Sequence, residues 1–295
     1  MALRIAVVTD IHYGPTKPTE TKLGLGALQL FDETVGEIAA YSPDLLVELG
    51  DRLSDDSPEA DAERLAELAE RFARLPGRRE HLQGNHDIVN LSETTTSRLL
   101  GRPLGHRSHD AQGWHLVFWE ASPEYRGGLR LSGEDLEWLE RDLNATSLPT
   151  VIFSHVPLGG GSMVGNYYFE GRSEGRAGHV NAELAREVIE ASGKVVLAVA
   201  GHVHWNSLHT VDGTHYVTVQ SLSETFTTAP QAAAAWATIE LGDTLHLSVL
   251  GNDPFEVSLT PKRLGSHWLP PRTRATSKRV GHAGATGSEG AGSDR

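Results

Sequence analysis

The sequence predicts an α/β fold, and three observations carry this prediction. Short apolar runs at 3–8, 44–49, 149–153 and 194–200 have the length of buried strands, and a run at 78–82 that ends in an apolar residue also resembles a strand. Stretches with apolar residues at helical spacing separate several of these runs, which is the alternation that builds a layered α/β fold. Each run ends in polar side chains, and α/β sheets hold ligands at the carboxyl edge of their strands. The sequence therefore predicts both the fold class and the edge at which a site lies.

Two helices are expected in the first third of the chain. Residues 21–41 have apolar side chains at helical spacing. Ser57 and Pro58 are typical of a helix start, because serine caps the first turn and proline fits within it. We expect this second helix to end near residue 74.

The remaining elements follow from similar signals. Residues 114–120 alternate between polar and apolar, as a strand does, and are expected to pair with 106–109. Residues 132–135 form a variant of the capping box, which predicts a helix to about residue 143. Asn181 is expected to cap a helix to about residue 192, and 207–250 to form short strands.

Composition limits the classes of function. The 295 residues carry a formal net charge of -13, which argues against nucleic acid or an anionic membrane as the main partner. The absence of cysteine excludes disulfides, zinc-thiolate sites and thiol catalysis. No apolar run approaches the roughly 18 residues of a membrane span, and no leader of signal-peptide type is seen. We expect a cytoplasmic protein with no membrane partner.

One domain is expected over 1–265, because no repeat or linker interrupts it. Residues 270–295 consist largely of Pro, Gly, Ser, Thr, Ala and basic residues. This composition predicts a disordered tail.

Five polar clusters follow the five strands. They are Asp10 with His12, Gly50-Asp51, Gly84-Asn85-His86-Asp87, His155, and Gly201-His202 with His204. One such cluster alone would be a weak signal, but five in order, each after a strand, are not expected by chance. Donors separated by one residue point the same way in an extended segment, so the pairs 10/12 and 202/204 are expected on extended strand ends.

These five clusters resemble, over roughly residues 1–250, those of the calcineurin-like metallophosphoesterases, and most of all the small bacterial phosphodiesterases and phosphatases. The resemblance implies a four-layer α/β/β/α sandwich with mixed sheets. It also implies a dinuclear metal site at the carboxyl ends of the strands, where a metal-bound hydroxide attacks phosphorus in line.

The resemblance also assigns the metal ligands. One metal would be held by Asp10, His12, Asp51 and His204, and the other by Asp51, Asn85, His155 and His202. Nitrogen and oxygen donors without sulfur suit two divalent or trivalent ions, with Mn or Fe favoured and Zn or Co as alternatives. Two such ions lower the pKa of a water molecule and stabilise the charge that develops on phosphorus.

Three further residues are candidates for catalysis. By resemblance, His86 lies near the phosphoryl oxygens as donor or general acid, and Asp87 would fix its tautomer and raise its pKa. Arg52 has two interpretations, because it could bind the substrate phosphate or pair with Asp55 or Asp56. The segment 50–55 is one residue longer than in many cyclic-nucleotide phosphodiesterases, which argues against that subgroup.

The glycine-rich segment 157–180 lies between two ligand clusters. It could close over a cleft, and its candidate substrate contacts are Tyr167, Tyr168, Phe169, Arg172 and Arg176, beside Asn85 and His86. Alternatively, its aromatic residues pack against the scaffold or against a second subunit. The second case implies a homo-oligomer. Outside the clusters, single histidines are assigned to ordinary structural roles, and His179 is left open.

The expected function is phosphoester hydrolysis of a small-molecule substrate. A phosphodiesterase acting on a nucleotide or glycerophospho-type substrate is favoured over a phosphomonoesterase acting on a small phosphorylated metabolite. A non-catalytic scaffold is the alternative from another class. Such proteins usually lose metal ligands, whereas this chain retains the full set.

Overall fold

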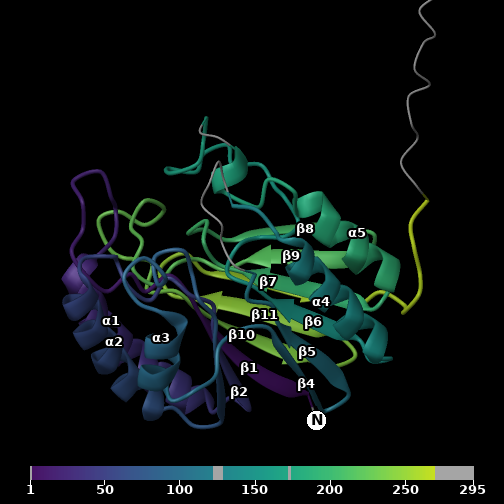
Figure 1. Cartoon of the computed structure of the whole chain (residues 1–295), viewed down its shortest axis with the longest axis horizontal. Helices are drawn as coiled ribbons and strands as arrows, with labels where there is room; N and C mark the ends of the chain where they lie inside the picture. Colours follow the sequence, from purple (N-terminus) through teal and green to yellow (C-terminus); the bar gives the residue numbers. More distant parts are fainter. Residues whose placement is uncertain (1, 122–128, 172–173, 270–295) are drawn as a thin grey trace, which may run out of the picture.

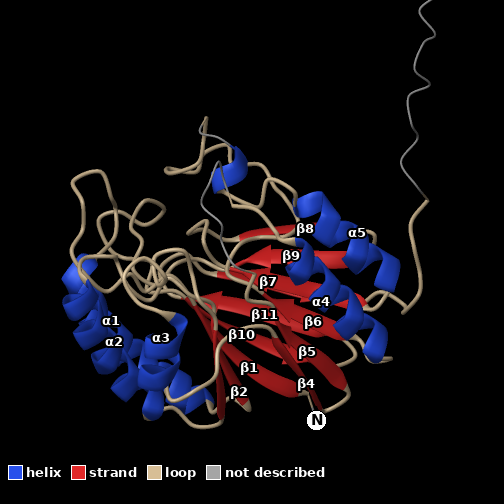
Figure 2. Cartoon of the chain, in the orientation of Figure 1, coloured by secondary structure: helices blue, strands red, loops and turns tan. Residues whose placement is uncertain are grey.

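The computed structural model describes residues 2–121, 129–171 and 174–269. Its centre is a pair of six-stranded sheets, both of them mixed (Figures 1 and 2). The first has the order β12-β11-β10-β1-β2-β3. Its strands are β1 (Leu3–Val8), β2 (Leu45–Glu48), β3 (Arg78–His81), β10 (Trp236–Leu241), β11 (Leu245–Leu250) and β12 (Phe255–Leu259). Strands β1, β2 and β3 run parallel, while β10, β11 and β12 pair antiparallel.

The second sheet has the order β4-β5-β6-β7-β9-β8. Its strands are β4 (Arg107–Ala111), β5 (Trp114–Phe118), β6 (Thr150–Phe153), β7 (Val195–Ala200), β8 (Ser207–Val211) and β9 (Thr214–Thr218). The four strands from β5 to β9 in this order are parallel, and the two edge strands pair antiparallel.

Helices cover the outer face of each sheet (Figure 2). The helices are α1 (Ala27–Tyr41), α2 (Pro58–Ala73), α3 (Glu93–Leu100), α4 (Gly133–Ala145) and α5 (Ala182–Ser192), with short 3-10 turns at Gly24–Gly26 and Glu174–Arg176. Helices α1 and α2 pack against the first sheet, and α4 and α5 against the second. The predicted four-layer α/β/β/α sandwich is therefore confirmed.

Strand β1 shows how the sequence builds these layers. Ile5 and Val7 belong to the core between the two sheets, whereas Ala6 and Val8 belong to the core under α1 and α2. Successive side chains of a strand point to opposite faces, so a strand that is covered on both faces is apolar throughout. This is why the run at 3–8 lacks polar alternation.

Several local predictions are confirmed. The Ser57 hydroxyl accepts a hydrogen bond from the backbone N–H of Ala60 (3.2 Å) at the start of α2. Ser132 and Asp135 form the capping box of α4. Strands β4 and β5 pair antiparallel, as expected for 106–109 and 114–120.

Two predictions of helix starts are wrong. Helix α1 begins at Ala27, because the preceding residues form a turn and Lys22 bridges to Glu224. Asn181 precedes α5, but its side chain does not cap the helix. It bonds the backbone N–H (2.9 Å) and carbonyl (3.0 Å) of Leu131 instead. Helix α3 and strand β12 were not expected.

None of the helices in the described ranges is both long and apolar enough to cross a membrane. The tail expected to be disordered, 270–295, lies outside the described residues.

Candidate metal centre

The five predicted clusters come together at one edge of the sandwich. They follow β1, β2, β3, β6 and β7, whose carboxyl ends meet there. Backbone hydrogen bonds join the first two loops, from Asp10 N–H to the Gly50 carbonyl (3.0 Å) and from His12 N–H to the Asp51 carbonyl (3.0 Å). The parallel strands therefore place residues 40 positions apart within one site.

The first donor cluster consists of Asp10, His12, Asp51 and His204. Their candidate ligand atoms all lie within 4.8 Å of one another, and all four residues are buried. The Nε2 atoms of His12 and His204 are 3.0 Å apart, and Asp10 Oδ1 lies 3.2 Å from His204 Nε2. Asp10 Oδ1 has no hydrogen-bond partner among the described residues. Buried carboxylate and imidazole donors that converge in this way fit a cation.

The second donor cluster consists of Asp51, His155 and His202, which meet the same 4.8 Å criterion. His155 Nε2 lies 3.3 Å from Asp51 Oδ2 and 3.3 Å from Asn85 Oδ1. Asp51 thus belongs to both clusters, and the amide oxygen of Asn85 borders the second. All seven residues predicted as ligands lie together, although their binding of metal stays a prediction.

Hydrogen bonds to the far side of three rings set which nitrogen faces the cluster. His155 Nδ1 donates to the Leu49 carbonyl (3.0 Å), and His202 Nε2 donates to the Arg176 carbonyl (2.7 Å). His204 Nδ1 donates to Glu224 (2.9 Å). Each bond fixes a tautomer and leaves the other nitrogen free to bind a cation. Glu224 was not predicted from the sequence, since its segment carries no recognisable motif.

The ligand pairs are not on extended strand ends, and that expectation is wrong. Asp10, His12, Asp51, His202 and His204 have φ angles of 53°, 48°, 53°, 69° and 56°. Left-handed backbone is unfavourable for residues with a Cβ and is concentrated at functional sites. Here, the turns after β1, β2 and β7 take this conformation while their side chains converge on one point.

Two glycines leave room for the carboxylates. A Cβ on Gly84 would lie 2.1 Å from Asp51 Oδ1, and a Cβ on Gly201 would lie 2.5 Å from Asp10 Oδ2. Both distances are far below van der Waals contact, so any side chain at either position would displace a candidate ligand.

The protonation of the rings follows from burial and charge. Burial lowers the pKa of His12 to about 3, with help from Lys22, and lowers the pKa of His202 to about 4, with help from His155. Burial also opposes charge on His155, but Asp51 and Asp10 raise its pKa to about 9. His12 and His202 are therefore neutral donors, and a cation must displace a proton from His155. Asp10 and Glu224 outweigh burial and raise the pKa of His204 as well.

Asp87 does not orient His86, contrary to the prediction. The Nδ1 atom of His86 is hydrogen-bonded to Asp55. Asp87 Oδ2 accepts from the backbone N–H groups of Asp51 (2.8 Å) and Gly84 (2.9 Å). It therefore ties together the two loops that carry Asp51 and Asn85. The sequence suggested Asp87 only because it is next to His86.

Arg52 matches neither of its two interpretations. Its side chain is fully buried and pairs with Glu48 (2.7 Å) and Asp87 (3.4 Å) instead of Asp55 or Asp56. The carboxylates of Asp87 and Glu48 outweigh burial and raise the pKa of Arg52 further, so the guanidinium stays charged. Because its guanidinium is not exposed to solvent, Arg52 stabilises the structure beneath the site and does not contact the substrate.

Two aromatic residues of the segment 157–171 pack onto the ligand histidines. The ring of Tyr168 lies 5.4 Å from that of His204, and the ring of Phe169 lies 5.5 Å from that of His202. The Tyr168 hydroxyl accepts from Thr21 N–H (3.0 Å), while the Tyr167 side chain is exposed. Packing against the scaffold thus accounts for Tyr168, while Tyr167 and Phe169 stay predicted substrate contacts.

The other two candidate contacts in this segment are arginines. Arg172 lies outside the described residues. Arg176 takes part through its backbone, since its carbonyl accepts the bond from His202.

Comparison with known proteins identifies the family. Residues 3–206 match the calcineurin-like phosphoesterases. The chain belongs to this family. The predicted resemblance is therefore confirmed, and the chain is a metal-dependent phosphoester hydrolase of a family that uses a dinuclear metal site.

Individual relatives extend the comparison. A probable cyclic nucleotide phosphodiesterase from Synechococcus sp. is 28% identical over 243 residues, which cover 82% of this chain and 88% of that protein. A dimetal phosphatase from Danio rerio has a TM-score of 0.70 at 16% identity, with 88% of this chain and 99% of that chain covered. A purple acid phosphatase from Lupinus luteus has a TM-score of 0.58 at 15% identity, with 88% and 54% covered. The two structures show the shared fold.

Proposed function

We propose that this chain is a phosphodiesterase that hydrolyses a small phosphodiester of the nucleotide or glycerophospho type. The observation that carries the proposal is the pair of donor clusters that share Asp51. The similarity to a probable cyclic nucleotide phosphodiesterase supports diesters over monoesters. The longer segment 50–55 counts less against that subgroup than expected, because its charged residue Arg52 is buried beneath the site.

The residues divide into two ligand sets. One ion would be held by Asp10, His12, Asp51 and His204, and the other by Asp51, Asn85, His155 and His202, with Mn or Fe as the favoured metals. Two bound ions would lower the pKa of water and stabilise the charge on the phosphoryl group. The candidate ligand side chains are buried, and a low-dielectric surrounding strengthens the electrostatic interactions among them.

His86 would supply the proton for the departing alkoxide. Its backbone N–H donates to Asp51 Oδ1 (2.8 Å), and its ring lies 5.0 Å from that of His12. Asp55 accepts from Nδ1, so that Nε2 is the nitrogen that exchanges a proton with substrate. Asp55 thereby takes the positioning role that was predicted for Asp87.

Hydrolysis of bis(p-nitrophenyl) phosphate and p-nitrophenyl phosphate by the Mn(II)-loaded protein tests the proposal. We expect a higher kcat/KM for the diester. We also expect His86→Ala to lower kcat by about 10²–10⁴-fold on a diester with an alkoxide leaving group, such as a cyclic nucleotide, while metal content stays the same. The p-nitrophenyl esters do not test this role, because p-nitrophenolate leaves without a proton donor. His246→Ala is the matched control, because this histidine lies on β11 and contacts Ser258.

Three outcomes would count against the proposal. Faster hydrolysis of the monoester would favour a phosphomonoesterase. A protein that binds no metal and hydrolyses neither compound would favour the scaffold. Full activity of the His86 variant would remove its role as proton donor.

Cell fractionation tests the expected cytoplasmic location separately.

A further inference from the structure

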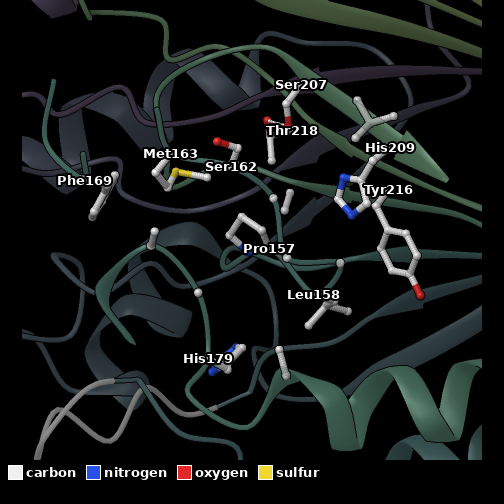
Figure 3. Close-up of a pocket in the computed structure, with 18 of the residues that line it drawn as sticks. Pro157, Leu158, Ser162, Met163, Phe169, His179, Ser207, His209, Tyr216 and Thr218 are labelled. Carbon is white, nitrogen blue, oxygen red and sulfur yellow. Dashed lines mark hydrogen bonds between the residues drawn. The ribbon is translucent and has the colours of Figure 1, made fainter. Parts of the chain in front are cut away.

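A cavity of about 510 Å³ lies beside the second donor cluster (Figure 3). Residues 157–164, 169–171 and 177–179, the start of α5 and the strands β7, β8 and β9 enclose it. Its near end is marked by Ser154, which precedes His155, and by Phe169, whose ring lies 5.5 Å from that of His202. The volume is in the range of small-molecule sites, so the cavity can hold a group attached to a phosphate at the metal centre.

The cavity has flat aromatic walls. His209 and Tyr216 stack with ring centroids 5.2 Å apart and 11° between their planes, and they form one wall. Phe169 and Met163 lie on the opposite side in Figure 3. Small side chains such as Ala198 of β7 leave the space between these walls open. This shape suits a planar ring, which stacks favourably on aromatic surfaces.

Two histidines that line the cavity each carry a buried ring nitrogen. His179 Nδ1 and His209 Nε2 have no hydrogen-bond partner in the described ranges. The His179 side chain is deeply buried, at 7% exposure, and burial lowers its pKa to about 4. Burial also lowers the pKa of His209. A neutral imidazole can donate or accept, and a buried polar group without a partner calls for an explanation.

The charge of the lining excludes a second anionic group. Among the described lining residues there is no lysine or arginine, and Glu170 is the charged residue present. A phosphate or carboxylate in this cavity would find no cation and would face a carboxylate. The group that suits this lining is uncharged and planar and carries hydrogen-bond donors and acceptors.

We propose that this cavity binds the nucleobase of a nucleotide substrate whose phosphodiester lies at the metal centre. This inference rests on the proposed function and decides between its two substrate types. A glycerol group has no ring to stack on His209 or Phe169, whereas a purine or pyrimidine has a flat face and polar edges.

Direct binding of nucleosides tests the cavity without turnover. Calorimetry with the Mn(II)-loaded protein would measure adenosine, guanosine, cytidine and uridine separately. Ala182→Phe, at the start of α5, fills the cavity, and Ala191→Phe is the matched control on an exposed face of the same helix. Ser162→Trp is a second filling variant at an exposed loop position, should the first fail to fold.

We expect at least one nucleoside to bind and to compete with the matching cyclic nucleotide. Ala182→Phe should weaken binding and raise KM for that nucleotide by about tenfold or more. The control should stay within about twofold. The kcat for bis(p-nitrophenyl) phosphate, which reports the metal centre, should not change in either variant.

His209→Phe tests the polar contact, because it keeps the stack on Tyr216 and removes the ring nitrogens. Weaker nucleoside binding with an unchanged kcat for the diester supports the proposal.

The inference is overturned if no nucleoside binds, if filling the cavity leaves binding and KM unchanged, or if the nucleoside binds without competing with the nucleotide. A protein that hydrolyses no phosphoester overturns the proposed function instead. In that case the calorimetry still tests separately whether the cavity binds nucleosides.

Discussion

Asp87→Asn is the substitution that best tests the architecture beneath the metal centre. Asp87 Oδ2 accepts from Asp51 N–H (2.8 Å) and Gly84 N–H (2.9 Å), and Oδ1 accepts from Arg52 N–H (3.0 Å). An asparagine of the same shape has one acceptor oxygen and one NH₂ group, which cannot accept. At least one of these buried N–H groups must therefore lose its partner.

The loss of folding free energy in Asp87→Asn has two sources. A buried N–H group without an acceptor costs about 1–3 kcal/mol. The fully buried Arg52 also loses one of its two carboxylates, and breaking a buried ion pair costs about 3–5 kcal/mol. Glu48 still pairs with Arg52 (2.7 Å), which reduces the second loss to about 2 kcal/mol, so we expect a destabilisation of about 3–5 kcal/mol in all. For a protein of this size, that lowers Tm by about 6–20 °C.

Differential scanning calorimetry and metal analysis would measure the effect. Because Asp87 holds the backbone of Asp51, the variant should also bind less metal. Asp56→Asn is the matched control, since Asp56 pairs with Arg64 at the surface (3.0 Å) and its side chain is 41% exposed. Pairs of this kind contribute about 0–1 kcal/mol.

One result would refute this account of Asp87. If Asp87→Asn keeps its Tm and metal content but shifts the pH dependence of kcat, Asp87 acts through His86, as the sequence first suggested. If Tm and metal content fall together while the Asp56 control is unchanged, the structural role holds.

Four further predictions follow from the same structure. Asp55→Asn should lower kcat by about 10–100-fold and shift the pH profile of kcat, because Asp55 is hydrogen-bonded to His86 Nδ1. Tm and metal content should not change, and activity equal to that of the unmodified protein would contradict this role. Gly84→Ala should weaken metal binding by about 10–100-fold, because its Cβ would lie 2.1 Å from Asp51 Oδ1. Metal titration measures this, and unchanged metal occupancy would show that the loop moves to accommodate the alanine. EDTA should lower Tm, since a ligand at 100 times its Kd adds about 2.7 kcal/mol; an unchanged Tm would mean that no structural metal was bound. Asp142 and Asp110 raise the pKa of His115, so its charged form stabilises the fold below the unfolded pKa and the benefit is lost as pH rises through the folded pKa. His115→Gln should therefore destabilise more at about pH 6 than at pH 9 in thermal melts, and an equal loss at both would exclude this role.

The sequence predicted the fold and the metal-ligand candidates well because both depend on local signals. A strand that is covered on both faces must be apolar, as at 3–8, and the side chain after it must leave the core. Metal chemistry adds a narrow choice of residue types, so Asp10, His12 and Asp51 were recognisable before any contact was known. The two buried clusters contain these residues together.

The partners of these residues could not be predicted in the same way. Asp55 lies 31 positions before His86, and Glu224 lies 20 positions after His204. Neither has a motif, because an acceptor for a ring N–H needs only an oxygen at the right place, which many turns can supply. Sequence adjacency favoured Asp87 for His86, but the turn aims its carboxylate at backbone N–H groups instead.

The direction of the ligand side chains depends on backbone angles that the sequence does not encode locally. The spacing of His202 and His204 suggested an extended strand, yet both residues have left-handed φ angles. Nothing in their own side chains favours that conformation. It is compatible with the structure because Gly201, next to His202, packs against Asp10, and His202 N–H donates to Asp10 Oδ2 (2.9 Å). The strained turn after β7 is therefore held by the loop after β1, a contact across 192 positions that only the assembled sandwich can supply.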